Sequence, residues 1–260
     1  MLTQRIVMTN VRANCRERFS ANDLDFVAKA VSGQSSVISP QLPGDPSHRP
    51  PITNHSSDSL AELLKEPEAL DVAIESDKLL KALLESPGNI PVTPQFYFYV
   101  LTRHMLMRFD RSVADYVASV LAGFANVVSS EGHAPSWLHS ERTRQSASLP
   151  TPYITDMLIS LKSASSEKEF MIRVQVGDYS LFLSGIFPQH IAHRSKHKAA
   201  PPLSFYEEVG SQNYRRASDH RLAREQSLVD TYRTIADRFS EVRVGLNQMS
   251  DRLLCLEGMG

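Results

Sequence analysis

The chain has 260 residues, a mass of 29.1 kDa and a formal net charge of −1, with 42% hydrophobic and 22% charged residues. These values are typical of a globular protein and exclude a disordered chain, a collagen and a disulfide-rich scaffold. Two cysteines, Cys15 and Cys255, are too few for a disulfide framework and favour a reducing compartment. No signal peptide opens the chain, and no stretch reaches the about 18–20 apolar residues of a membrane span. We therefore expect a cytoplasmic protein without membrane contact.

The N-terminal third of the chain contains a sharp change in composition. Residues 1–32 predict an N-terminal helical arm, whose main helix is capped by Ser20 and ended by Gly33. Residues 33–56 contain five prolines, each of which lacks a backbone donor and disfavours helix in the residue before it. We expect three parts: the arm 1–32, a proline-rich linker or loop 33–56, and a helical bundle domain 57–260.

Within the bundle domain, apolar residues recur with helical spacing in most segments, and the alternation typical of strands is nearly absent. Thr93 and Pro94 form a typical helix start, and Ser204 with Glu207 fits a capping box. The segment 166–187 is apolar nearly all round, which indicates a central, buried helix. The expected helical segments are 57–86 (divided by Pro67), 95–109, 110–127, 152–163, 166–187, 189–197 and 205–218, with an exposed loop over 128–150. The predicted fold class is all-α, a multi-helix bundle.

The last predicted helix has the clearest pattern. Seven apolar residues follow one another at steps of three and four, which is a heptad pattern. They are Tyr232, Ile235, Phe239, Val242, Leu246, Met249 and Leu253. A single helix over about 221–254 would be roughly 50 Å long, more than a small domain spans. We call these seven residues the heptad seam; it packs either on the chain's own helices or on a second molecule, and we favour a homodimer with a coiled-coil-like contact.

Two predicted helices carry polar residues among apolar ones. The segment 95–109 contains Tyr97, Arg103 and His104, and the segment 166–187 contains Asp178 and Tyr179. A buried polar group needs a partner, because an unsatisfied one costs about 1–3 kcal/mol. Asp178 is therefore expected to be buried and paired, with Arg103 or His104 as its partner. These residues form either a polar pocket for a small ligand or an internal network that sets helix register, and we favour the network.

The segment 189–197 carries a histidine pattern that is compatible with metal binding. His190, His193 and His197 lie at i, i+3 and i+7, within an arc of about 60° on a helix. Three imidazoles on one face can ligate a metal ion. The neighbouring cations Arg194 and Lys196 oppose this, so we favour a solvated, titratable basic face.

Charge is distributed unevenly along the chain. Residues 57–86 hold eight acidic and three basic residues, a net charge of −5, whereas residues 188–224 hold seven basic and three acidic residues, a net charge of +4. The basic residues of this second segment are Arg194, Lys196, Lys198, Arg215, Arg216, Arg221 and Arg224. Such a face suits an anionic partner such as nucleic acid, or the acidic segment of the same molecule or of a dimer partner.

The sequence contains no P-loop, dinucleotide-binding glycine motif or nucleophile elbow, so we assign no catalytic residue and expect no cofactor. The leading hypothesis is a non-catalytic cytosolic helical protein that self-associates or binds a protein partner. The first alternative is a small-ligand-binding or enzymatic helical domain with a polar pocket between helices. The second alternative is a nucleic-acid-associated protein that uses the basic face over 190–224.

Overall fold

The computed structural model describes residues 15–32, 64, 66–85, 92–130, 154–198 and 200–255, with the side chains of 126–130 and 252–255 left out. These residues form twelve α-helices and two short 3-10 helices, and no strand occurs among them, which confirms an all-α multi-helix bundle. The 3-10 helices are η1 (Arg16–Arg18) and η4 (Leu161–Ser163). The α-helices are α1 (Ala21–Ser32), α3 (Pro67–Ile74), α4 (Asp77–Glu85), α5 (Pro94–Met105), α6 (Arg111–Ser130), α7 (Ile154–Ser160), α8 (Ser166–Ile186), α9 (Pro188–His197), α10 (Leu203–Ser218), α11 (Arg221–Glu225), α12 (Val229–Asp237) and α13 (Phe239–Cys255).

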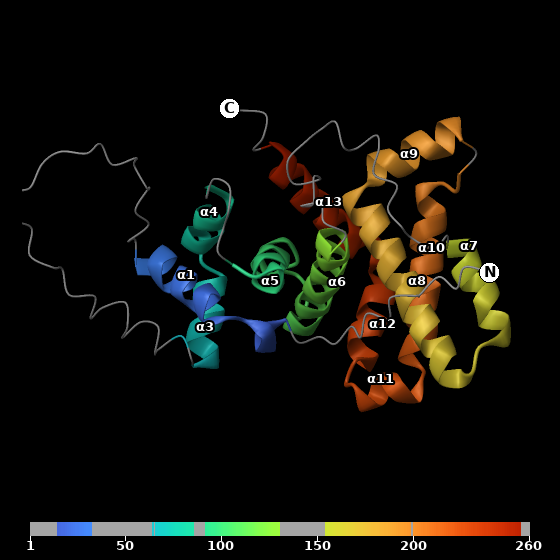
Figure 1. Ribbon diagram of the computed structural model, residues 1–260, viewed down its shortest axis with the longest axis horizontal. Helices are drawn as coiled ribbons and strands as arrows, with labels where there is room; N and C mark the ends of the chain where they lie inside the picture. The colour runs from blue at the N-terminus through green and yellow to red at the C-terminus, as the bar shows by residue number, and fades with distance from the viewer. Residues whose placement is uncertain are drawn as a thin grey trace, which may run out of the picture.

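The helices pack in two groups joined through α5, α6 and α13 (Figure 1). Helices α1, α3 and α4 lie on one side beside α5. On the other side α7, α9 and α10 pack against α8, while α11 and α12 pack against α10. Helix α13 contacts both α5 and α8. One apolar cluster runs through both groups and includes Val27 and Ala28 of α1. Residues 15–32 therefore pack into the same core, whereas the sequence predicted a separate arm; the proline-rich segment 33–56 lies outside the described residues.

Polar contacts fix the N-terminal helix to the bundle. The hydroxyl of Ser20 accepts from the Asp23 amide at 3.2 Å, and the Asp23 carboxylate accepts from the Ser20 amide at 2.7 Å, which is a reciprocal cap. The same carboxylate accepts from the amide of Thr93 at 2.7 Å and from its hydroxyl at 2.9 Å. Because Thr93 also caps α5 at the Phe96 amide, the starts of α1 and α5 are held together.

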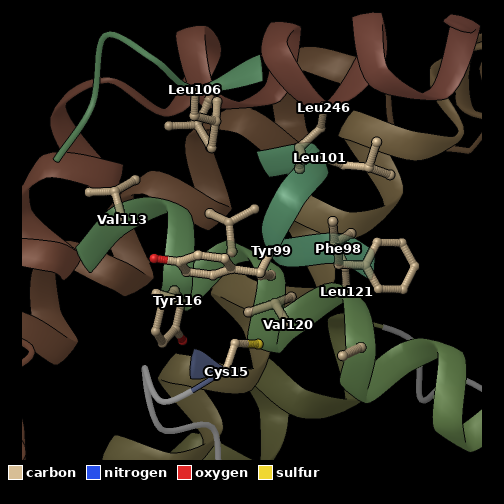
Figure 2. Packing of buried hydrophobic residues seen from close by; sticks show 14 of the residues in the cluster. Cys15, Phe98, Tyr99, Leu101, Leu106, Val113, Tyr116, Val120, Leu121 and Leu246 are labelled. Carbon is tan, nitrogen blue, oxygen red and sulfur yellow. The ribbon is translucent and has the colours of Figure 1, made fainter. Parts of the chain in front are cut away.

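Figure 2 shows the core where α5, α6 and α13 meet. Buried apolar side chains from these helices surround Tyr99 and Tyr116, with Cys15 at the edge. The labelled members are Phe98 and Leu101 of α5, Leu106 at the C-cap of α5, Val113, Val120 and Leu121 of α6, and Leu246 of α13. Burying each large apolar side chain stabilises the fold by roughly 1.5–3 kcal/mol, so this packing links the two groups of helices.

Helix α8 is the central, buried helix that its sequence predicts. It contacts α6, α7, α9, α10 and α13, and its residues are buried on all sides over Val176–Ser184, apart from the half-buried Tyr179. Glycines let neighbouring helices approach closely. A Cβ atom on Gly185 would lie 2.8 Å from the Leu246 Cβ, and one on Gly210 of α10 would lie 2.5 Å from the Phe239 ring.

The region 221–254 is not the single helix that we predicted. It forms α11, α12 and α13, with breaks at 226–228 and at Arg238. Ser227 adopts a left-handed φ of 56°, the Leu228 amide bonds to the Ala223 carbonyl at 2.8 Å, and the Ser227 amide bonds to the Arg224 carbonyl at 3.1 Å. This pair of bonds is a Schellman motif, which ends a helix. Glycine is usual at the left-handed position, so serine there hides the break from sequence analysis.

Despite these breaks, the heptad seam residues of α12 and α13 all face the core of the chain. Its six members from Tyr232 to Met249 are each at most 3% exposed in the single chain, and the side chain of Leu253 lies outside the described residues. The seam packs on the chain's own helices, because α12 contacts α6 and α10 while α13 contacts α5 and α8. The six described members are therefore buried within the chain and do not form an exposed apolar surface.

Two further predictions concern helix ends and membranes. The Thr93 cap of α5 is confirmed, but α10 starts at Leu203 with Pro202 as its N-cap, so the expected Ser204–Glu207 capping box is wrong. Ser204 therefore lies inside the first turn of α10, where its side chain is not at the N-cap position. The described helices include none with both the length and the apolar character that crossing a membrane requires.

Candidate functional site

The most unusual polar group of the core is the carboxylate of Asp178 in α8. Its Oδ1 accepts hydrogen bonds from the hydroxyl of Tyr116 in α6 at 2.6 Å and from the hydroxyl of Tyr214 in α10 at 2.7 Å. Asp178 is 5% exposed and both tyrosines are fully buried. The structure thus confirms that Asp178 is buried and paired, with partners that the sequence analysis did not name.

Three tyrosine rings enclose this carboxylate. The Tyr232 ring of α12 lies 5.2 Å from the Tyr116 ring in an edge-on contact and 5.7 Å from the Tyr214 ring in a stacked one. A Cβ atom on Gly177 would lie 2.9 Å from the Tyr214 ring, so this glycine is what lets the ring rest on the α8 backbone. Gly177 in an apolar helix signalled a close approach by a neighbouring element, but nothing in the sequence identified that neighbour as Tyr214.

Burial controls the ionisation of this cluster. Loss of hydration raises the pKa of Asp178 to about 7, although the hydrogen bonds from Tyr116 and Tyr214 act in the opposite direction. Burial also raises the pKa of both tyrosines well above the usual value, and the nearby carboxylate adds to this. The phenols therefore stay neutral donors, and Asp178 is the member that exchanges a proton near neutral pH.

The predicted pocket residues of α5 do not meet Asp178. Arg103 donates to the Glu75 carboxylate, and His104 contacts the Ile74 carbonyl at 2.9 Å, so both face α3 and its C-terminal end. Tyr97 lies edge-on to Phe98, and burial raises its pKa to about 12. Helix α6, which supplies Tyr116, occupies the place beside Asp178 that the sequence analysis gave to α5.

Tyr179, the remaining predicted pocket residue, is half-buried beside the Phe124 ring at 6.3 Å. The five residues thus belong to four separate environments. The cluster around Asp178 has tightly packed aromatic walls, and its hydroxyl donors are buried and already bonded. Such an arrangement supports a role in helix register, which was the favoured sequence interpretation.

A different kind of polar group lies on the surface, on α9. This helix packs against α8 and α10, and its buried residue Ile191 is 3% exposed. His193, Lys196 and His197 are exposed on the opposite side, and the rings of His193 and His197 lie 4.7 Å apart. From Phe187 to Tyr206 the sequence contains no acidic residue. Helix α9 therefore presents positive charge that its own segment does not neutralise.

The cations of α9 also have no acidic partner elsewhere in the described structure. Its permanent charges are Arg194, Lys196 and, at the C-cap, Lys198. Every ion pair between described residues involves other cations. Of the nearest carboxylates on α10, Glu207 accepts from Arg243 of α13 at 2.5 Å and Glu208 accepts from Gln212 at 3.1 Å. Neither of these carboxylates is therefore paired with a cation of α9.

The three histidines of α9 do not form a metal site. Among the residues that the structure describes, no three histidine, cysteine or acidic side chains come together as metal ligands. Burial, Arg194 and His193, followed by Lys198, lower the pKa of His190. The same positive field that lowers this pKa opposes a divalent cation, which is the reason that the basic-face interpretation suits these residues better.

The basic face predicted over 190–224 is divided in the structure. Figure 1 places α9 and α11 at opposite ends of α10, a helix of 16 residues and therefore about 24 Å long. The residues near α9 are Arg194, Lys196 and Lys198, and those near α11 are Arg215, Arg216, Arg221 and Arg224. The basic residues of this segment therefore form two clusters, one near each end of α10.

The two halves of the divided face also differ in pairing. Near α11, Arg215 bonds to Asp237 at 2.5 Å, and Arg221 pairs with Glu225 and with Glu167. Acidic residues thus offset part of that cluster, whereas the α9 cations are unpaired within the described residues. The acidic helices α3 and α4 lie on the other side of the molecule and do not neutralise α9 (Figure 1).

Comparison with known proteins adds no analogy to these sites. No protein-family model, no curated protein and no solved structure matches the chain.

Proposed function

We propose that this chain is a non-catalytic cytosolic helical protein that binds an acidic segment of a partner protein through α9. The observation that carries the proposal is the charge of α9, where the exposed Lys196 and Lys198, the half-buried Arg194 and three exposed histidines lack any acidic partner among the described residues. Surface cations without partners contribute little to stability, so a cluster of them favours a role in recognition. The buried Asp178 cluster then serves the scaffold and not the binding surface.

An acidic protein segment fits α9 better than nucleic acid does. Duplex DNA carries one negative charge per about 1.7 Å, and its complexes usually cover about 1,000–2,500 Å² of protein. Helix α9 has ten residues and is about 15 Å long. The second basic cluster is separated from it by the length of α10 and is partly neutralised by Asp237, Glu225 and Glu167. A short surface of this kind matches a short acidic peptide segment.

A second copy of this chain is a weaker source of the acidic segment. In the acidic region of the molecule, Asp71 is 4% exposed and bonded to Arg16 and Arg111, and Glu75 is paired with Arg103. These carboxylates are thus used inside the chain. Self-association remains one outcome of the test below.

Fluorescence anisotropy with a labelled poly-aspartate peptide tests the proposal at low ionic strength. We expect saturable binding that weakens at least tenfold when Arg194, Lys196 and Lys198 are all changed to Gln. The matched control changes Lys78, Lys162 and Lys168 to Gln, which are exposed cations of α4, η4 and α8. Equal weakening in both triple variants would show nonspecific attraction and contradict the proposal.

A competition with duplex DNA of equal charge and a sedimentation measurement complete the test. Preferential binding of the DNA would replace the protein-partner proposal with the nucleic-acid alternative. A salt-sensitive dimer that the α9 variant abolishes would identify a second copy as the partner.

A further inference from the structure

We propose that binding at α9 is coupled to proton uptake, with His190, His193 and His197 as the residues that contact the carboxylates of the partner. This inference rests on the proposed function and adds the pH dependence and the contact residues of the same surface.

The first step is the position of the histidines on the helix. At 100° per residue, His190, His193 and His197 share one arc of the α9 surface, and His193 lies nearly opposite the buried Ile191. Arg194 and Lys196 lie on the two flanks of this arc. A segment that docks along the exposed face of α9 therefore meets the imidazole row first and the permanent cations at its edges.

The second step is the charge around the row. All three histidines are exposed, and the His193 and His197 rings lie 4.7 Å apart. Burial, followed by Arg194, His193 and Lys198, lowers the pKa of His190. A carboxylate bound beside the row would favour protonated imidazoles, because an opposite charge stabilises the charged form.

The third step is the absence of competing acids on the helices that pack against α9. Helix α8 faces it with its C-terminal turns, and residues 180–187 contain no titratable side chain. On α10, Tyr206 lies near Arg194 and burial raises the pKa of Tyr206, so this phenol stays neutral. Glu207 and Glu208, also on α10, are bonded to Arg243 and Gln212. The described neighbours of α9 thus supply no internal carboxylate for the histidines.

The consequence is a gain of positive charge on binding. Three permanent cations give the segment a charge of +3, and protonation of three histidines would double it. Proton uptake on binding strengthens binding as the pH falls, by up to about tenfold per pH unit for each proton taken up. We expect the affinity for poly-aspartate to increase at least tenfold between pH 7.5 and pH 5.5. Aspartate has an ordinary pKa of about 3.9, so the probe itself stays charged over this range.

The decisive variant replaces all three histidines by glutamine, which keeps a polar side chain that does not titrate. We expect H190Q/H193Q/H197Q to lose the tenfold gain in affinity between pH 7.5 and pH 5.5, whatever its affinity at pH 7.5. The control R194Q/K196Q/K198Q should bind more weakly at both pH values and keep the gain. Circular dichroism at each pH checks that the fold is intact, because Asp178 and Asp115 titrate in the same range.

The outcomes separate the two proposals. A gain at pH 5.5 that persists in the histidine variant overturns the proton-coupled inference and leaves α9 as a binding surface. Tight binding without any pH dependence in the unchanged chain also overturns the proton-coupled inference and leaves α9 as a binding surface. An absence of binding to poly-aspartate at both pH values overturns the proposed function itself, and the inference falls with it.

Discussion

Two carboxylates in different parts of the core are buried to nearly the same degree and are satisfied in different ways. Asp71 in α3 is 4% exposed and accepts from the guanidinium groups of Arg16, at 3.0 Å, and of Arg111. Asp178 in α8 is 5% exposed and accepts from two tyrosine hydroxyls. One site therefore compensates both the charge and the hydrogen-bonding capacity of its carboxylate, whereas the other compensates only the hydrogen-bonding capacity.

The difference lies in the charge of the donors, because a neutral donor satisfies hydrogen bonding but does not compensate a buried negative charge. Two cations beside a carboxylate offset the loss of hydration that burial causes. Two phenols leave most of that loss uncompensated, so burial raises the pKa of Asp178 to about 7. The region around α3 is thus held by charge, and the region around α8 is held by a group whose charge depends on pH.

The largest expected effect comes from removing the acceptor at Asp178. Asp178→Ala leaves the hydroxyls of Tyr116 and Tyr214 buried without an acceptor, and we expect the free energy of unfolding to fall by about 3–4 kcal/mol at pH 6. Asp71→Ala should cost about 1–2 kcal/mol, because Arg111 is largely exposed and its guanidinium reaches water. Urea unfolding measures both, and equal losses would contradict the proposed contrast.

The pH dependence of stability should be next in size. The folded chain holds the Asp178 proton more tightly than the unfolded chain, whose aspartates have a pKa of about 3.9. This stabilisation is complete below about pH 3.9 and is lost as the pH rises through 7, so Asp178 should lower the free energy of unfolding by about 2–3 kcal/mol between pH 5 and pH 8. Urea unfolding across this range is the measurement.

Asp178→Asn tests that assignment, because an amide does not titrate. The variant should lose most of the decrease between pH 5 and pH 8. Asp115, whose pKa burial raises to about 6, contributes in the same direction and should account for much of what remains. An unchanged pH profile in Asp178→Asn would show that another group is responsible.

Removing one hydroxyl donor should have a smaller effect with a distinct signature. Tyr214→Phe deletes one hydrogen bond to the carboxylate and should cost about 1 kcal/mol. The same hydrogen bond favours the ionised form, so its loss should raise the pKa of Asp178 and move the midpoint of the pH dependence upward. Tyr232→Phe, which alters the same ring cluster, is the control and should leave the midpoint in place. Equal midpoints in all variants would argue against a direct role for Tyr214.

The smallest expected effect is that of salt. Raising NaCl from 0.05 M to 1 M should reduce the stability difference between the unchanged chain and Asp71→Asn by about 0.5 kcal/mol, because Arg111 is solvent-exposed and its ion pair is screened. At pH 6, the difference between the unchanged chain and Asp178→Asn should stay constant, because its partners are neutral. A salt response of equal size at both sites would remove the distinction between them.

Local patterns predicted much of this fold. Apolar periodicity predicted the helices that became α5, α6, α8, α9 and α10, and the nearly uniform apolar surface of α8 correctly indicated its central position. The caps at Ser20 and Thr93 were also predicted, because a cap depends on residues three positions apart. The break at Ser227 was missed, since a serine in the left-handed conformation gives no local signal.

The candidate sites show where such patterns stop being sufficient. The burial of Asp178 followed from its apolar helix, but its partners Tyr116 and Tyr214 are 62 and 36 residues away in the chain. The predicted partners Arg103 and His104 were wrong because helix spacing does not say which helix lies beside which. The division of the basic residues into two clusters did not follow from the sequence for a related reason, since it depends on α10, about 24 Å long, lying between α9 and α11.

The sequence by itself determined which residues form helices, which faces are apolar and where charge accumulates, because these properties depend on neighbours within about one turn of helix. Only the tertiary structure decided that the heptad seam packs inside the chain, that tyrosines and not arginines surround Asp178, and that α9 keeps its charges exposed. Those outcomes depend on how helices distant in sequence share a limited apolar surface, and that competition is settled by packing over the whole molecule.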